Sequence, residues 1–411
     1  MKNFTLSLLF LLIVGNSMAQ KNSTLNWIFQ NDTSHFQTKN QKFKLRFGGR
    51  IFADAAYYFE DKTELESGGE IRDLRLRFDL AYAKKWSASI NVDFSEMEID
   101  MKDAYVKYSI DSNRFLRAGY FLEPFGIEQT ESTNSTMFMH VASTIEAFRP
   151  GRNIGVEYNW WNKSYNLGLG IFGDIEIEEE KGRSYYYYGY YPYHSQDEKK
   201  LSFNGYGVSS RFSITPIQNN WNILHLGVSG NYWIVDKEDK KLRYQSRAAT
   251  HVENERFLNV VIDNAKSQLM YGLEVIYASQ NYSFQSEFIK TRVNRDSEFN
   301  DYIAEGWYAQ LGWMIKGGNY KYSNQTARLS QPNKGAIEIT FRYNETDLFD
   351  TSNYYLKGMG GRQRDYTVGC NWYITQNMMA KFNYTNVDLD KYAINGEENF
   401  NMIQTRLQFS F

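Results

Sequence analysis

The last ten residues, MIQTRLQFSF at positions 402–411, decide the fold class of this chain. Leu407, Phe409 and Phe411 fall on one face of an extended strand and polar residues fall on the other, because successive side chains of a strand point to opposite sides. A strand that is apolar on one face, polar on the other and aromatic at its end is typical of a bacterial outer-membrane β-barrel. The segment therefore predicts a transmembrane strand.

The same two-residue alternation recurs along the chain before this segment. It is present at 45–51, 74–80, 86–94, 104–108, 116–120, 154–160, 165–171, 206–212, 224–232, 271–277, 282–288, 307–313, 337–343, 366–372 and 380–384. With the last segment this gives about sixteen strands, and single-chain bacterial barrels have an even number. The predicted fold class is all-β: a transmembrane antiparallel up-and-down β-barrel over residues 44–411.

The links between these strands alternate in length. Short turns such as 83–85 and 111–113 separate long links such as 122–150 and 236–269. Outer-membrane barrels have short periplasmic turns and long external loops, so this alternation supports the strand assignment. The link 316–334 is an exception, since it is long but falls on the side of the short turns. No change in composition along the links marks a second domain.

The composition fits a barrel and excludes several other classes. The 411 residues include 32 Tyr and 28 Phe, yet the mean hydropathy is −0.59. A barrel explains both, because half of each strand faces lipid and aromatic girdles lie at both interfaces. The single Cys370 excludes a disulfide framework and is in phase with the apolar wall residues around it. Because the net charge is only −2, a preference for anions must come from local arrangement.

The N-terminus predicts export. A short basic start is followed by an apolar run from Phe4 to Val14, which is too short to cross a bilayer. Ser17 and Ala19 are small residues at the positions that a signal peptidase reads, so residues 1–19 are expected to be a signal peptide cut before Gln20. Residues 20–43 are polar and are expected to form a loose periplasmic segment.

The strand at 71–82 carries the residues most relevant to function. Leu74 and Leu76 must face lipid, because the opposite register would place arginines there at a cost of roughly 2–4 kcal/mol each. Arg75 and Arg77 are therefore predicted to point into the lumen. The strand at 44–55 gives the same result, since its inward positions are Lys44, Arg46 and Arg50. Two neighbouring strands thus bring four arginines and a lysine to one sector of the wall.

Two interpretations of this cluster remain open. Guanidinium groups bind phosphate through paired, charge-assisted hydrogen bonds and keep their charge at all ordinary pH values. A row of them can replace the water shell of an anion in steps and pass it without trapping it. Alternatively, the arginines pair with Asp73, Asp79 and Asp93 and only hold the wall together, since buried charges are usually paired.

Other chemistry has weak support in the sequence. His35, His140, His194, His225 and His251 show no metal-ligand spacing, so no metal site and no cofactor are expected. One histidine, His140, is close in sequence to Ser143 and Glu146, but three such residues within a polar loop are common by chance. No glycine-rich phosphate loop joins a strand to a helix. An enzyme is therefore not expected, and neither is a nucleic-acid partner.

Several motifs resemble those of the phosphate-selective porin O and P family of outer-membrane porins. They are Lys-Asp-Ala-Tyr at 102–105, Ala-Gly-Tyr-Phe-Leu-Glu-Pro-Phe-Gly-Ile-Glu at 118–128, Phe-Met at 138–139, Arg-Pro-Gly-Arg-Asn-Ile-Gly-Val at 149–156, Gly-Trp-Tyr-Ala-Gln at 306–310, Gly-Ala-Ile-Glu at 335–338 and Gly-Cys-Asn-Trp-Tyr at 369–373. The Glu-Pro-Phe-Gly and Pro-Gly-Arg pieces together are fairly specific. The resemblance covers nearly the whole chain after the signal peptide.

The resemblance implies a homotrimer of sixteen-stranded barrels that conducts small anions such as phosphate. It also implies that two external loops and one periplasmic turn fold into the lumen, which matches 122–150, 236–269 and the long turn 316–334. The family carries alternating arginines on an external segment. Arg243 and Arg247 occupy that place here, although Gln245 and Ala248 depart from the family pattern.

The resemblance also points to individual residues of the anion path. Arg75 and Arg77 lie in the segment that supplies central arginines in the family. Lys102 belongs to the Lys-Asp-Ala motif, but its phase with Ala104 predicts that it points outward, whereas Lys107 has the inward phase. The predicted function is an outer-membrane porin that passes small anions, such as phosphate or polyphosphate, by facilitated diffusion. The alternative is a general or sugar-admitting porin without phosphate selectivity.

Overall fold

The structure is a computed structural model. It describes residues 25–30, 33–38, 42–59, 62–95, 99–173, 176–177, 201–202, 205–236, 240–353 and 360–411. The predicted signal peptide, residues 1–19, lies outside this part of the chain.

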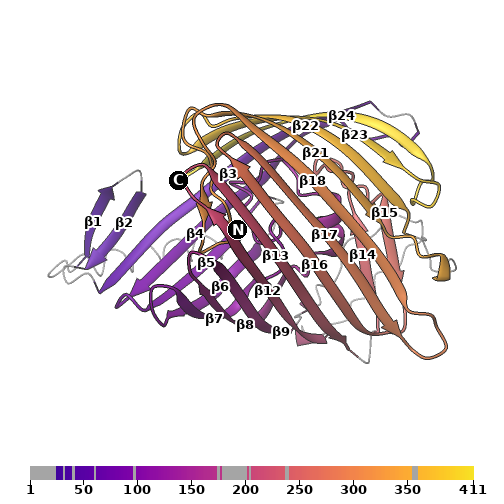
Figure 1. Cartoon of the computed structure of the whole chain (residues 1–411), viewed down its shortest axis with the longest axis horizontal. Coiled ribbons are helices and arrows are strands. Elements are labelled where there is room, and N and C mark those ends of the chain that lie inside the picture. Colours follow the sequence, from indigo (N-terminus) through magenta and orange to yellow (C-terminus); the bar gives the residue numbers. More distant parts are fainter. Residues whose placement is uncertain are drawn as a thin grey trace, which may run out of the picture.

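Within the described residues, sixteen antiparallel strands close into a barrel (Figure 1). They are β3 (Phe43–Phe59), β4 (Gly68–Tyr82), β5 (Trp86–Asp93), β6 (Asp100–Ser109), β7 (Arg114–Leu122), β8 (Arg152–Trp161), β9 (Tyr165–Gly173), β12 (Gly205–Gln218), β13 (Asn222–Val235), β16 (Ala265–Ser279), β17 (Tyr282–Arg295), β18 (Tyr302–Lys316), β21 (Ile337–Asp347), β22 (Arg362–Trp372), β23 (Met378–Leu389) and β24 (Glu398–Ser410). The barrel closes where β24 pairs with β3, from Asn401 opposite Phe59 to Ser410 opposite Arg50. The predicted fold class and the predicted strands are confirmed.

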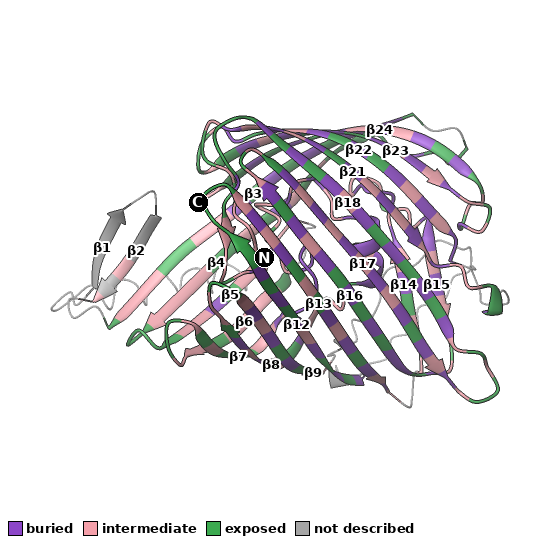
Figure 2. Ribbon diagram, viewed as in Figure 1, coloured by how far each residue is buried: buried purple, intermediate pink, exposed green. Residues whose placement is uncertain are grey.

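Exposure alternates along the strands and gives the barrel a striped wall (Figure 2). In β18 the outward side chains of Trp307, Leu311 and Trp313 are 38–51% exposed, whereas Tyr308 between them is fully buried. The exposed set is apolar and belongs against lipid, and the inward set packs on lumen loops or faces the lumen. The described residues contain no helix that is long and apolar enough to cross a membrane.

Three connections fold into the lumen, as the resemblance implied. The first follows β7 and contains the short helix α2 (Ser143–Phe148); Lys381 of β23 donates to its Thr136 and Phe138 carbonyls. The second carries the hairpin of β14 (Leu242–Ser246) and β15 (Leu258–Ile262), whose buried Tyr244 stacks on Tyr302 with ring centroids 6.0 Å apart. We call these the inward loop (123–151) and the external hairpin loop (240–264).

The third is the long turn between β18 and β21, which we call the inward turn (317–336). It contains β19 (Tyr322–Ser323) and β20 (Arg328–Leu329). Arg328 donates to the carbonyl of Thr130, so the inward turn meets the inward loop inside the barrel. A loop and a turn from opposite ends of the barrel therefore share the lumen.

Smaller elements complete the described chain. They are β1 (Leu25–Gln30), β2 (Thr33–Thr38), β10 (Glu176–Ile177), β11 (Leu201–Ser202) and the 3-10 turn η1 (Thr351–Asn353). β1 and β2 form a hairpin that pairs with the start of β3, where His35 lies opposite Arg46. The barrel sheet thus continues for two strands at the start of the chain, beside β3 (Figure 1).

Candidate pore-lining site

A cavity of about 930 Å³ lies between β3–β9 on one side and the inward loop and inward turn on the other. Twelve basic side chains of the described residues line it: Arg46, Arg50, Arg72, Arg75, Arg77, Lys102, Lys107, Arg117, Arg149, Arg152, Arg211 and Arg328. Five carboxylates line it as well: Asp79, Asp103, Glu128, Glu131 and Glu157. The cavity wall therefore carries more basic than acidic side chains.

The alternation of β3 and β4 places four of these arginines. Arg46 and Arg50 of β3 and Arg75 and Arg77 of β4 all line the cavity, while Leu76 between the last two is 41% exposed on the outside. The register brings Arg50 directly opposite Arg75. A smaller cavity of about 220 Å³ is lined by Lys44 together with Arg46, Arg77 and Lys107. The inward orientation expected from phase is therefore observed for these side chains.

Carboxylates hold several of these arginines. Asp73, which is 2% exposed, forms ion pairs with a terminal nitrogen of Arg50 at 2.8 Å and with Nε of Arg75 at 2.6 Å. Asp93 accepts from the same Nε at 2.9 Å. Further along β4, Nε of Arg77 contacts Asp79 at 2.9 Å. The ion pairs named by the structural alternative are therefore present, and buried pairs of this kind fix the direction of each guanidinium.

The ion pairs differ in which nitrogens of the guanidinium group they occupy. In the described residues, the carboxylates that pair with Arg75 and Arg77 contact Nε. The N–H groups of the two terminal nitrogens are therefore available to other acceptors. Arg152 follows the same rule, with Nε 3.2 Å from Asp103. Arg50 does not, because its terminal nitrogens contact Asp73 and, at 3.3 Å, Asn134 of the inward loop. Guanidiniums held through Nε are both oriented and able to donate to a solute.

Two β-bulges bring further cations to the cavity. In β6, Asp103 lies opposite Asn91 and Met101 lies opposite Val92, so Lys102 is an extra residue that has no opposite residue on β5. The phase of Ala104 predicted that Lys102 points outward, and this is wrong: its side chain lines the cavity. In β4, Arg72 is the extra residue in the same way, between Ile71 and Asp73. A bulge adds one residue to one strand, which resets the alternation beyond it.

Five of the lining cations have no carboxylate within ion-pair distance in the described chain: Arg46, Arg72, Lys107, Arg149 and Arg328. Lys107 lies over the ring of Phe115, 5.3 Å from its centroid. Arg149 is exposed and follows α2 on the inward loop, and its backbone N–H is bonded to the Ile145 carbonyl. The charges of these side chains are therefore not held in a direct ion pair with any described carboxylate.

Arg243 and Arg247 lie away from this cavity, on the external hairpin loop. Arg243 is exposed and donates through Nε to Asn259 at 2.9 Å. Arg247 lies beside α2, where Glu146 accepts from its backbone N–H at 2.9 Å. Glu146 also pairs with Arg256 at 2.8 Å. The two external arginines are therefore a separate group from those of the wall.

The sequence analysis missed several lining residues. Arg117 of β7 lies between the outward Leu116 and Ala118, so its phase already predicted an inward position. Arg149 and Arg152 belong to the Arg-Pro-Gly-Arg motif, which was noted without a role for its charges. Arg211 of β12 adjoins the outward Phe212, so its phase also predicted an inward position. Arg328 reaches the cavity only through tertiary contacts, and local pattern carries no signal for such contacts.

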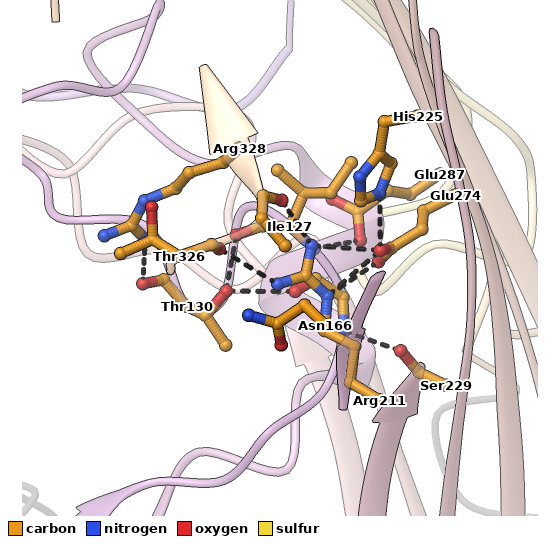
Figure 3. A network of polar contacts seen from close by, with 12 residues as sticks. Ile127, Thr130, Asn166, Arg211, His225, Ser229, Glu274, Glu287, Thr326 and Arg328 are labelled. Atoms are coloured by element: carbon orange, nitrogen blue, oxygen red, sulfur yellow. Dashed lines mark hydrogen bonds and ion pairs between the residues drawn. The ribbon is translucent and has the colours of Figure 1, made fainter. Parts of the chain in front are cut away.

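Buried polar contacts fix the inward loop and inward turn (Figure 3). Glu287 of β17 accepts from the backbone N–H groups of Ile127 at 2.8 Å and Glu128 at 2.9 Å. The preceding Gly126 has φ +63°, and a Cβ there would lie 2.3 Å from Glu287 Oε2, so glycine is required. Two N–H groups converging on a carboxylate resemble a backbone anion nest. Glu287 therefore anchors the inward loop to the wall.

A second network anchors the inward turn. Arg211 of β12 binds Glu274 through Nε at 3.0 Å and donates to the carbonyls of Thr326 and Ala327 at 3.4 and 3.0 Å (Figure 3). The His225 ring is hydrogen-bonded on both sides. Its Nε2 lies 2.9 Å from a Glu274 carboxylate oxygen, and its Nδ1 lies 2.6 Å from the Tyr322 hydroxyl. Because all these groups are enclosed and satisfied, the turn has a fixed place in the lumen.

The residues that could suggest a hydrolase do not form one. Ser143 donates to Asp365 at 3.1 Å and accepts from Gln363 at 2.6 Å. His140 bonds to the adjacent Val141 carbonyl at 3.0 Å, and Glu146 faces arginines. In the described chain, no three metal-ligating side chains gather in one place.

Sixteen outward-apolar strands around loops and a cation-lined lumen define an outer-membrane porin. Such a fold is that of a channel rather than an enzyme. The model of the family described as phosphate-selective porin O and P matches residues 43–411, and the chain belongs to that family. It is accordingly a protein of the bacterial outer membrane.

Individual relatives agree with this assignment. The chain is 23% identical to Porin O of Pseudomonas aeruginosa, over 91% of this chain and 90% of the relative. Among solved structures, an anion-selective porin from Comamonas acidovorans superposes with a TM-score of 0.53 at 11% identity, covering 90% of this chain and all of that one. OmpT of Vibrio cholerae, in a structure described as a trimer form, gives 0.52 at 8% identity, covering 90% and 99%. These structures share the fold.

Proposed function

We propose that this porin passes small anions, with phosphate as the principal solute, by facilitated diffusion. The observation that carries the proposal is the composition of the cavity: twelve basic side chains and five carboxylates line it, although the whole chain has a net charge of −2. Positive charge is thus concentrated where a solute must pass. A lining of this sign raises the local concentration of anions and lowers that of cations.

The residues are proposed to act in two ways. Arg75 and Arg77 form the core of the anion site, because Nε contacts orient them and their terminal N–H groups remain for the solute. Arg46, Arg72, Lys107 and Arg149 add charge without a carboxylate partner in the described residues. A set of such groups, none of which encloses the ion alone, favours entry while allowing release.

Other cations have supporting roles in this proposal. Arg50 and Lys102 are proposed to contribute positive charge to the wall, where each is held beside a buried carboxylate: Arg50 beside Asp73 and Lys102 beside Asp93. Arg243 and Arg247 lie on the external hairpin loop and are proposed to draw anions toward the entrance. This role needs no direct contact with an anion in the cavity, because charges attract an ion in solution over a distance of about 10 Å.

Phosphate is proposed because of the family. The matching model is described as phosphate-selective, and Porin O is the curated relative with matching length. Arginine suits this solute, because its planar fork matches two phosphate oxygens at once. The second candidate is a general or sugar-admitting porin. The ion pairs along β4 favour it, since they neutralise part of the wall.

Planar-bilayer recordings test the proposal. A salt gradient of potassium chloride across a membrane containing the porin should give a reversal potential of the sign expected for anion flow. Phosphate added at constant chloride should then block the chloride current in a saturable way. Cation selectivity would overturn the anion proposal, whereas anion selectivity without phosphate block would favour the general porin.

We also propose that the porin is a homotrimer. The family resemblance and the trimeric form of the similar OmpT support this state. Light scattering of the detergent-solubilised protein, corrected for bound detergent, should give three times the protomer mass. A monomer mass under conditions that preserve the folded barrel would contradict the proposal.

A further inference from the structure

The carboxylates of the cavity are almost all paired. Four have a cationic partner: Asp79 with Arg77 at 2.9 Å, Asp103 with Arg152 at 3.2 Å, Glu128 with Arg342 at 3.5 Å, and Glu157 with Arg117. Glu131 is different. Within the described residues its side chain has no ion pair and no hydrogen bond, although it lines a cavity rich in cations.

Glu131 lies at a defined point of the lumen. It follows Thr130, whose carbonyl accepts from Arg328, so it sits where the inward loop meets the inward turn. Its side chain is half-buried, and the adjoining Ser132 and Thr133 line the same cavity. The Thr133 hydroxyl is enclosed and lacks a hydrogen-bond partner. Of these groups, the half-buried Glu131 carboxylate is the one that a solute in the cavity can reach.

An unpaired carboxylate in an anion path requires an explanation. An ionised carboxylate only accepts hydrogen bonds, and it repels an anion that offers none. Phosphate near neutral pH keeps a proton and can donate an O–H to the carboxylate, whereas sulfate carries no proton and cannot. Arginine binds both oxyanions through the same oxygens, so the guanidiniums alone do not separate them.

We infer that Glu131 in its ionised form discriminates between oxyanions, accepting a hydrogen bond from a proton-bearing oxyanion of the phosphate class and repelling one without a proton, such as sulfate. The inference rests on the proposed anion function and names a specificity determinant within it. The neighbouring cations attract both oxyanions, and Glu131 subtracts from that attraction only for the oxyanion that cannot donate.

The charged surroundings of Glu131 predict a pH dependence. Burial raises the pKa of Glu131 to about 8; Arg328 of the inward turn and Lys381 of β23 oppose the rise, and Glu128 and Glu287 add to it. Below that pH the carboxyl is protonated and can donate to either oxyanion, so discrimination is small. Above it the group is ionised, and only the proton-bearing oxyanion gains a hydrogen bond.

The experiment compares block of chloride current by phosphate and by sulfate in the full-length porin. It uses the wild type, Glu131→Gln and Glu131→Asp at about pH 6.5 and about pH 9.5, on either side of the carboxyl titration. The measured quantity is the ratio of the half-blocking concentration of sulfate to that of phosphate. Between the two pH values this ratio should rise about tenfold more in the wild type and Glu131→Asp than in Glu131→Gln, in which only the second ionisation of phosphate itself changes the ratio.

Each outcome decides the inference. An equal rise in the wild type and Glu131→Gln would overturn it, because another group would then be responsible. Block by both oxyanions with the same ratio at both pH values in the wild type would overturn it while leaving the anion function intact. Absence of block by either oxyanion would remove the proposed phosphate function and this inference with it. An unfolding midpoint of Glu131→Gln in detergent equal to that of the wild type, followed by tryptophan fluorescence, shows that the variant is folded.

Discussion

Arginines point into the lumen from both sides of the barrel, but the two sides use them differently. On the side filled by the inward loop, Arg342 is 1% exposed, donates to the His140 carbonyl at 3.0 Å and lies 3.5 Å from Glu128. On the same side Arg406 binds Asp54 through both Nε and a terminal nitrogen. These guanidiniums are fully enclosed, so they hold the structure together and are closed to a solute.

On the cavity side Arg77 and Arg149 stay accessible, whereas the side chains of Arg50 and Arg75 are only 10% and 11% exposed. The Arg77 side chain is 51% exposed and is held through Nε, and Arg149 is exposed without a carboxylate partner in the described chain. The difference teaches that inward phase is necessary but not sufficient for a pore-lining role. Whether the inward loop covers an arginine decides if it stabilises the barrel or faces the solute.

The largest effect should come from breaking an enclosed pair. Replacing Arg342 with Met leaves Glu128 buried without its cation, which should lower the free energy of unfolding by about 3–5 kcal/mol. Unfolding by guanidinium chloride of the barrel in detergent, followed by tryptophan fluorescence, measures the change. The matched control is Arg292→Met on the outer surface, whose pair with Asp301 is 60% exposed on the arginine side and should contribute at most about 1 kcal/mol. Equal midpoints for the two variants would contradict the comparison.

A smaller and different effect is expected on the cavity side. Arg149→Gln removes one unpaired charge from the lining, so the half-blocking concentration of phosphate should rise about tenfold, corresponding to about 1.4 kcal/mol. Stability should stay close to the wild type, because the Arg149 side chain has no bonded partner in the described residues. Bilayer recordings measure the block, with Arg292→Gln as the charge-matched control. A phosphate block unchanged in Arg149→Gln would show that Arg149 is a spectator.

The strands could be predicted from the sequence because alternation is a local property. Each of the predicted segments falls on a barrel strand, and the inward positions of Arg50, Arg75 and Arg77 follow from their neighbours alone. Lys102 could not be placed in this way. Its bulge depends on how β6 pairs with β5, and the phase read from Ala104 holds only on the far side of the bulge.

The partners of the arginines could not be predicted either. The contact between Arg342 and Glu128 joins residues far apart in the chain, and it exists because the inward loop crosses the lumen to that wall. The ion pairs of Arg75 with Asp73 and Asp93 were left open beside the anion interpretation, and the structure contains them. Pattern gives the direction of a side chain, whereas the tertiary fold gives its neighbours.

The smallest effect tests whether Arg77 needs its ion pair with Asp79, which engages Nε and leaves the terminal nitrogens available. Asp79→Asn removes the carboxylate that holds Nε at 2.9 Å, so two consequences oppose each other. The guanidinium loses a fixed direction, which weakens binding, and the cavity loses a negative charge, which strengthens it. Because the Arg77 side chain is 51% exposed, water screens the pair and the orienting term is small. The charge should therefore dominate, and the half-blocking concentration of phosphate should fall about threefold, or about 0.6 kcal/mol.

The sign of that change separates the two uses of a lumen arginine. A weaker phosphate block in Asp79→Asn, with the barrel still folded, would mean that Arg77 works only when its carboxylate directs it, as the enclosed arginines do. Asp73→Asn is the contrasting variant, because Asp73 is 2% exposed and serves Arg50 and Arg75 together. Its removal leaves two guanidiniums closely opposed on neighbouring strands, so it should lower stability before any gain in anion block appears.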